Sequence, residues 1–174
     1  VHPHLKFKLL ICYGEHQRIM GRLQEAMNFH EEALKLATQL NHRQLLAQAT
    51  CAVGETLLVK RDYRTAGEFC TEALALFKQT GQNHDWLATT LHALGIVALG
   101  DKRYEESISL LEESVQLRRR LDKRQPLARA LVALGNSYRD NQQFNRAIHC
   151  YEESIEILEA TCYARDKLMA LINL

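Results

Sequence analysis

The side chains best suited to chemistry in this chain of 174 residues are eight histidines and five cysteines. Imidazole and thiolate groups bind transition metals when three or four of them converge, and a thiolate beside a base can act as a nucleophile. The spacing favours neither, because no set of acidic or cysteine ligands stands at helical spacing from His2, His4 and His16, and no C-x-x-C pair occurs. We therefore expect no metal site and no cofactor.

The cysteines are interpreted as small buried thiols in a reducing, cytoplasmic compartment, with a redox or disulfide role as the alternative. No serine-hydrolase elbow, phosphate-binding glycine loop or H-E-x-x-H zinc motif is present. The sequence thus predicts that this chain is not an enzyme and has no catalytic residues.

One basic cluster stands out, and it comprises Arg118, Arg119, Arg120, Lys123 and Arg124. Cations at the end of a helix complement its carbonyl dipole, which gives the cluster a structural role. The alternative is a docking site for an acidic partner or a nucleic-acid backbone. Because no aromatic residues are interleaved with the cluster and the net charge is only +1, a nucleic-acid partner is not expected.

The elements that position these side chains repeat along the chain. Gly14, Gly54, Gly95 and Gly135 recur at steps of 40, 41 and 40 residues, each in the same local pattern. Apolar residues three and four apart define two helical faces in every unit, separated by a short polar break. Small residues twelve and nineteen positions after each glycine predict that a second helix packs closely on the first. The unit is therefore an antiparallel helix hairpin.

This pattern resembles the tetratricopeptide repeat, and the resemblance rests on two groups of residues. These are Leu94–Gly95 with Tyr104, and Leu134–Gly135 with Tyr138, Phe144, Ala147 and Tyr151. The family's usual repeat has 34 residues. The longer repeat here is similar to that of kinesin light chains and of the sensor arms of bacterial regulators, and its extra residues are expected in linkers and helix ends at 39–42, 81–84 and 121–124.

The resemblance implies an all-α, right-handed solenoid of four hairpins and the first helix of a fifth. The repeats are expected at 3–40, 43–80, 85–121 and 126–162, with a partial repeat at 164–174, all in one domain over 1–174. Because the pattern stops within a repeat, we expect a fragment of a larger protein. Leu168, Leu171 and Ile172 in the partial repeat would offer an apolar surface for self-association. No apolar run approaches the length of a membrane span, so no membrane partner is expected.

In the resembled fold the first helices line a concave groove, and their groove positions are free to serve a ligand. Those positions are Lys8, Glu15, Arg18, Gln48, Glu55, Thr89, His92, Ile96, Leu99, Arg129, Asn136 and Arg139. Acidic residues mark one end, although Arg18 interrupts them, and arginines mark the other, with an apolar centre between.

The predicted function is therefore protein–protein interaction, with a peptide or protein segment bound in the groove. The resemblance also implies that Asn136 binds peptide backbone. Two alternatives remain at this point. The partner could bind the convex face instead. The chain could also be the ligand- or peptide-sensing arm of a multidomain signalling or transcription regulator.

Overall fold

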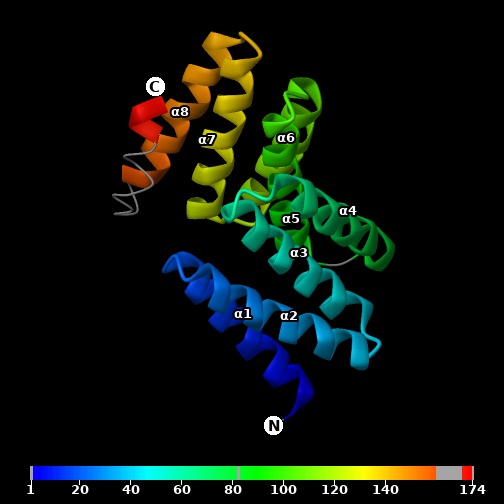
Figure 1. Ribbon diagram of the computed structural model, residues 1–174. Coiled ribbons are helices and arrows are strands. Elements are labelled where there is room, and N and C mark those ends of the chain that lie inside the picture. The colour runs from blue at the N-terminus through cyan, green and yellow to red at the C-terminus, as the bar shows by residue number, and fades with distance from the viewer. Residues whose placement is uncertain (1, 82, 160–169, 174) are drawn as a thin grey trace. The chain divides into compact units, whose positions relative to one another are not determined.

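The computed structural model describes residues 2–81, 83–159 and 170–173, and contains eight long α-helices in that part of the chain (Figure 1). The helices are α1 (Pro3–Ile19), α2 (Leu23–Gln39), α3 (Arg43–Val59), α4 (Tyr63–Thr80), α5 (His84–Gly100), α6 (Tyr104–Arg120), α7 (Arg124–Asp140) and α8 (Phe144–Glu159). No strand occurs among the described residues. The predicted all-α fold of consecutive helix hairpins is confirmed.

The chain divides into two compact units, Val1–Trp86 and Leu87–Leu174. Helices α1 to α4 form two hairpins in the first unit, and α5 begins at its end. The rest of α5 with α6, and α7 with α8, form two hairpins in the second unit. Of the partial fifth repeat, residues 170–173 are helical, while 164–169 and Leu168 lie outside the described residues. Leu171 and Ile172 are exposed, as expected.

Six of the turns between consecutive helices are built alike, whether they lie within a hairpin or between two hairpins. After α1 the backbone N–H of Gly21 donates to Arg18 O (3.1 Å) and that of Arg22 to Gln17 O (2.9 Å), with Gly21 in the left-handed region at φ 77°. This is the Schellman end of a helix. Left-handed residues at the corresponding position of five further turns are Asn41, Arg61, Lys102, Asp122 and Gln142, whereas after α4 Gly81 directly follows the last helical residue and its N–H donates to Phe77 O (3.0 Å).

Because the turns are equally short, the residues beyond the usual repeat length lie in the helices. Most helices have 17 residues. The expectation of longer linkers was therefore wrong, and only its second part, longer helix ends, is correct. Local signals fix several helix starts: Asp62 Oδ1 accepts from the backbone N–H of Thr65 (3.2 Å), and Pro126 stands in the first turn of α7.

Each repeat glycine brings its hairpin's two helices together, as the sequence predicted. A Cβ at Gly54 would lie 2.6 Å from Cys70 Sγ, and a Cβ at Gly95 would lie 2.5 Å from Leu111 Cγ. The corresponding partners of Gly14 and Gly135 are the rings of His30 and Tyr151. All four partners are buried and stand sixteen residues after their glycine. The glycine is thus required by the close approach of the helices.

Both units bury small apolar residues at the contacts between hairpins. In the first unit Ala33 and Ala37 of α2 pack with Ala49 and Ala52 of α3. In the second unit Val115 of α6 packs in a cluster with residues of α7 and α8. The second cluster contains Leu111, Val115, Leu127, Ala130, Leu131, Ala133, Leu134, Tyr138, Ala147, Cys150 and Tyr151. None of the described helices is long and apolar enough to span a membrane.

Candidate functional site

The twelve predicted groove residues fall into two sets on first helices of hairpins. Lys8, Glu15 and Arg18 lie on α1, and Gln48 and Glu55 on α3, in the first unit. The other seven lie in the second unit, and they are Thr89, His92, Ile96 and Leu99 of α5 with Arg129, Asn136 and Arg139 of α7. Three of the twelve, Lys8, Arg129 and Arg139, are exposed, and the rest are half-buried.

In the first unit the structure brings Glu15, Arg18 and Glu55 together. Arg18 Nη2 lies 2.5 Å from Glu15 Oε2 and 3.6 Å from Glu55 Oε2. Burial lowers the pKa of the Arg18 guanidinium, but the two carboxylates outweigh burial and raise it above its ordinary value. Arg18 therefore compensates both glutamates, which makes this part of α1 and α3 a structural ion-pair network as well as a polar surface.

His30 of α2 extends this network into the interior. Its Nδ1 lies 2.9 Å from Thr56 Oγ1, whose hydroxyl donates to Ala52 O (2.9 Å). Because that hydroxyl proton is already used, Nδ1–H must be the donor to Thr56, and Nε2 is left as the bare acceptor. Nε2 is buried without a hydrogen bond, 3.7 Å from Glu15 Oε1.

Burial lowers the pKa of His30, and the opposing effect of Glu15 does not restore it. The folded protein thus keeps His30 neutral, while the unfolded chain protonates it near its ordinary pKa of about 6.5. We expect stability to be complete above that pH and to fall below it, by up to ~1.4 kcal/mol per pH unit until the folded pKa is reached. Urea unfolding at several pH values between neutral and mildly acidic measures the slope.

The control for this pH dependence uses the repeat itself. His30→Leu installs the residue type that Leu111 supplies at the same repeat position, and should flatten the slope. His149→Leu, at an exposed position of α8, should leave it unchanged. Equal slopes for the parent and His30→Leu would show that another group is responsible.

In the second unit the predicted residues of α7 point in one direction, because 129, 136 and 139 share a helical face. Arg139 Nε donates to Asp140 Oδ1 (2.9 Å), so its charge is partly compensated by its neighbour. Asn136 Oδ1 accepts from Tyr151 OH (2.8 Å), which fixes the amide against α8. On α5, Ile96 is half-buried and packs against the core cluster, so only part of it is available to a ligand.

The basic cluster at the end of α6 is divided by the fold. Arg118 is buried and its Nη1 donates to Pro126 O (2.5 Å), which ties α6 to the first turn of α7. Arg119 Nη2 donates to both carboxylate oxygens of Glu153 on α8 (2.7 and 2.6 Å). These contacts support the structural interpretation of the cluster.

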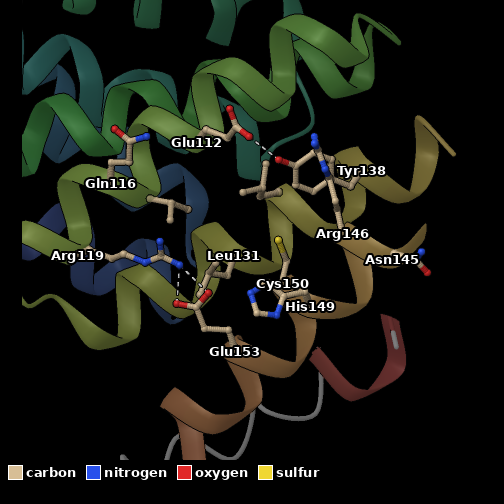
Figure 2. A pocket seen from close by; sticks show the side chains of 12 residues that line it. Glu112, Gln116, Arg119, Leu131, Tyr138, Asn145, Arg146, His149, Cys150 and Glu153 are labelled. Atoms are coloured by element: carbon tan, nitrogen blue, oxygen red, sulfur yellow. Dashed lines mark hydrogen bonds and ion pairs between the residues drawn. The ribbon is translucent and has the colours of Figure 1, made fainter. Parts of the chain in front are cut away.

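A pocket of about 520 Å³ lies in the second unit between α6, α7 and α8 (Figure 2). Val115, Leu131, Leu134 and Cys150 provide its apolar lining. The polar lining residues are Glu112, Gln116, Arg119, Tyr138, Asn145, Arg146, His149 and Glu153. The volume is in the range typical of small-ligand sites, ~300–1,000 Å³.

Two polar pairs border this pocket, as the dashed lines of Figure 2 show. At one end the Tyr138 hydroxyl donates to Glu112, and the Arg146 guanidinium stands 5.6 Å from the centre of the Tyr138 ring. At the other end Arg119 bonds to Glu153. Burial, with the carboxylate of Glu112, raises the pKa of Tyr138 to about 12, so this hydroxyl stays a donor at neutral pH.

Sequence reasoning missed this pocket because it searched the first helices. The signal was a small residue in a column of large ones: fifteen positions after the repeat glycine stand Phe29, Phe69, Leu110 and then Cys150. Phe29 fills its place by stacking on Tyr13, with ring centroids 5.8 Å apart. Cys150 is too short to fill the equivalent space, which leaves the pocket open.

The cysteines agree in part with the expectation of buried thiols. Cys51, Cys70 and Cys150 are buried thiols, whereas Cys12 is exposed, and Cys162 lies outside the described residues. The expectation was wrong for Cys12 because its helix face, which faces a preceding helix in later repeats, is uncovered on α1. Burial raises the pKa of Cys70 to about 12 and that of Cys150 to about 11, which disfavours the reactive thiolate.

The family match agrees with the repeat architecture. A protein-family model described as tetratricopeptide repeat matches residues 45–120 and again 95–160, which together exceed half of the chain. The chain belongs to the tetratricopeptide repeat family. In this tetratricopeptide repeat protein the repeat glycines and their close-packed partners are therefore the hairpin contacts of the family's fold. Among curated proteins, none matches the chain.

Solved structures share the fold of this tetratricopeptide repeat protein. BtubC (BKLC) from P. vanneervenii is 20% identical, with a TM-score of 0.71 over 92% of this chain and 66% of that one. A Rap protein complexed with competence and sporulation factor is 12% identical, with a TM-score of 0.82 over 98% and 47%. The TPR-like repeats of a Podosopora anserina putative kinesin light chain are 16% identical, with a TM-score of 0.68 over 99% and 85%.

These identities establish a common fold and no more. The chain spans 66% of BtubC and 47% of the Rap protein, so it corresponds to only part of each. The resemblance to kinesin light chain repeats that the sequence indicated is confirmed at the level of the fold by the kinesin light chain structure. Among the residues described here, no group of three or more histidine, cysteine or acidic side chains is placed to hold a metal ion.

Proposed function

We propose that this tetratricopeptide repeat chain is a protein-interaction module that holds a peptide or protein segment against the first helices of its hairpins. In the second unit the ligand would lie on α5 and α7. The observation that carries this proposal is the polar and apolar division of that surface. Half-buried Ile96 and Leu99 offer apolar contacts on α5, and exposed Arg129 and Arg139 stand on α7.

The ligand chemistry follows from these side chains. Arginine binds carboxylates through its planar fork of N–H donors, so an acidic stretch would lie on α7. A leucine-like anchor would contact Ile96 and Leu99. Asn136 is engaged by Tyr151 through its Oδ1, which leaves the amide N–H₂ to donate to a peptide carbonyl oxygen. Within the first unit taken by itself, Lys8 and Gln48 would serve a ligand on α1 and α3, whereas Arg18 already neutralises Glu15 and Glu55.

The role proposed here is binding without catalysis in this segment. The thiols of Cys70 and Cys150 are held protonated by burial, and the His30 imidazole is enclosed. The fold neighbour complexed with competence and sporulation factor supports a second form of the proposal. In that form the surface belongs to a sensing arm. Binding of a peptide changes the conformation of the arm, and the change is transmitted to other domains.

A charge reversal tests the assignment to α7. The probe is a fluorescein-labelled peptide with paired leucines followed by a run of glutamates, and its affinity is measured by anisotropy at low salt. Arg129→Glu/Arg139→Glu should weaken binding about tenfold or more, because two favourable charge contacts become repulsive. Increasing salt should reduce the difference.

The matched control carries the same change of net charge elsewhere. Arg43→Glu/Arg64→Glu reverses two exposed arginines in the first turns of α3 and α4 and should bind the probe with unchanged affinity. Equal weakening by both double variants would indicate only a nonspecific charge effect. Unchanged affinity of the Arg129→Glu/Arg139→Glu variant would reject the surface. A sensing arm would in addition show changed hydrogen exchange away from α5 and α7 on binding.

A further inference from the structure

We propose that the pocket between α6, α7 and α8 is a second peptide-docking site, which takes a bulky apolar side chain followed by a carboxylate. This site uses the second helices α6 and α8 together with the floor residues of α7, so it is separate from the surface proposed above. It could engage a partner whether or not that surface is occupied.

The apolar half of the ligand is indicated by the pocket floor. Val115, Leu131 and Leu134 come from two helices and line the pocket together with the Cys150 side chain. Figure 2 shows Leu131 and Cys150 between the two polar pairs, so an apolar group entering there would contact them. Burial of a phenyl or leucyl side chain in such a lining is the main source of affinity in small sites.

The acidic half of the ligand is indicated by the hydrogen-bonding groups of the rim. Both carboxylates already accept bonds, Glu112 from Tyr138 and Glu153 from Arg119. Arg119 donates to Glu153 from Nη2, and Arg146 donates to Gln143 from Nη1 (3.1 Å), so these bonds use only some of the N–H groups of the two lining guanidinium groups. An arginine carries five N–H donors and no acceptor. The rim therefore has an excess of donors, which a ligand carboxylate satisfies.

The repeat pattern distinguishes this hairpin at one position that lines the pocket. Large side chains occupy the equivalent column elsewhere, where Phe29, Phe69 and Leu110 are half-buried. Only Cys150 in that column is small. A phenylalanine at this position is therefore compatible with the fold of the repeat, and it would fill the pocket with the protein's own side chain.

The test uses three blocked dipeptides on the whole chain: acetyl-Phe-Glu-amide, its neutral analogue acetyl-Phe-Gln-amide, and acetyl-Ala-Glu-amide, which lacks the apolar anchor. Binding is followed by amide chemical shifts in ¹H–¹⁵N spectra. We expect acetyl-Phe-Glu-amide to bind with weak, saturable affinity and to shift amides of α6, α7 and α8 around the pocket. The other two should each bind about tenfold more weakly or not measurably.

Variants separate docking from folding. Cys150→Phe should abolish binding of acetyl-Phe-Glu-amide while keeping the helical circular dichroism and the thermal midpoint of the parent. Cys150→Ala keeps the pocket and should keep binding. Arg146→Gln should lower the affinity for the Glu dipeptide to that for the Gln dipeptide, without changing the latter, and this holds as a test even should Cys150→Phe fail to fold.

The Arg129→Glu/Arg139→Glu variant should bind acetyl-Phe-Glu-amide like the parent, since it changes a different surface. If Arg129→Glu/Arg139→Glu binds the labelled peptide as well as the parent does, the proposal for α5 and α7 fails and the pocket proposal stands. If the dipeptides do not bind as expected, the pocket proposal fails and the proposal for α5 and α7 stands. Equal affinity of Cys150→Phe and the parent, no saturable shifts, or shifts clustered outside α6, α7 and α8 would each overturn the proposal. So would equal affinity for the Glu and Gln dipeptides.

Discussion

Gly95→Ala should destabilise the protein by about 2 kcal/mol, although alanine is the better helix former by ~1 kcal/mol. A Cβ at this position would stand 2.5 Å from Leu111 Cγ and 2.9 Å from its Cδ2. Leu111 is fully buried, so its side chain cannot move aside without disturbing the core cluster around it. The loss should appear as a lower urea midpoint in circular dichroism. It reflects overpacking at the closest approach of α5 and α6.

A double-mutant cycle identifies the cause. Leu111→Ala alone removes a buried side chain and should cost about 2–5 kcal/mol. Combined with Gly95→Ala, it leaves room for the new methyl group, so the pair should cost clearly less than the sum of the two single changes. Ser109→Ala, on the exposed face of α6, is the control for helix propensity and should be neutral or slightly stabilising. Strict additivity in the cycle would contradict the steric explanation.

Arg18→Met should lower the free energy of unfolding by about 3 kcal/mol, which is the second large effect. From the sequence pattern alone this side chain would be expected to face the solvent. Methionine keeps much of the side-chain volume but removes the cation that contacts both Glu15 and Glu55. The three side chains are only 15–27% exposed, so water screens their charges incompletely. Removing one partner from a poorly hydrated ion-pair network costs more than breaking an exposed pair. Thermal or urea unfolding at neutral pH measures the loss.

Neutralising the glutamates should reverse much of this loss. The triple variant Arg18→Met/Glu15→Gln/Glu55→Gln is expected to be more stable than Arg18→Met alone, because no charge is then left unpaired. Lys6→Met breaks an ion pair of 2.8 Å with Glu32, whose partners are both 50% exposed, and should change stability by less than ~1 kcal/mol. A loss from Lys6→Met as large as that from Arg18→Met would mean that burial of the ion pair is not the deciding factor.

The fold could be predicted from the sequence because its determinants are local and repeated. The glycine column, the small residues after it and the polar breaks each recur four times, so a chance match in one unit is outweighed by the others. The short polar break predicted within each repeat is present, and at Gly21, Arg61 and Lys102 it holds the left-handed residue that follows the end of a helix. The length of the linkers was misjudged because helix ends and polar linkers have the same composition.

The candidate sites could be predicted only in part, because they depend on pairings between distant residues. The face shared by Arg129, Asn136 and Arg139 follows from helical spacing alone. The compensation of Glu55 by Arg18 joins α1 with α3 and has no signal within either helix. The pocket depends on the small size of Cys150 at a position where the other repeats have Phe or Leu. This difference is visible only when the repeats are aligned, and the residues around the pocket are known only from the structure.

The fit between each repeat glycine and its partner has a consequence for assembly. Since six of the turns inside and between hairpins are alike, chain connectivity alone does little to distinguish correct helix partners from shifted ones. The four partners are a histidine, a cysteine, a leucine and a tyrosine, which differ in size and polarity. Should α4 and α8 trade places, through misfolding or exchange between two molecules, a tyrosine ring would crowd the space shaped for a thiol and leave a void in return. The differences between the four partner residues thus disfavour mispairing of helices that are otherwise similar.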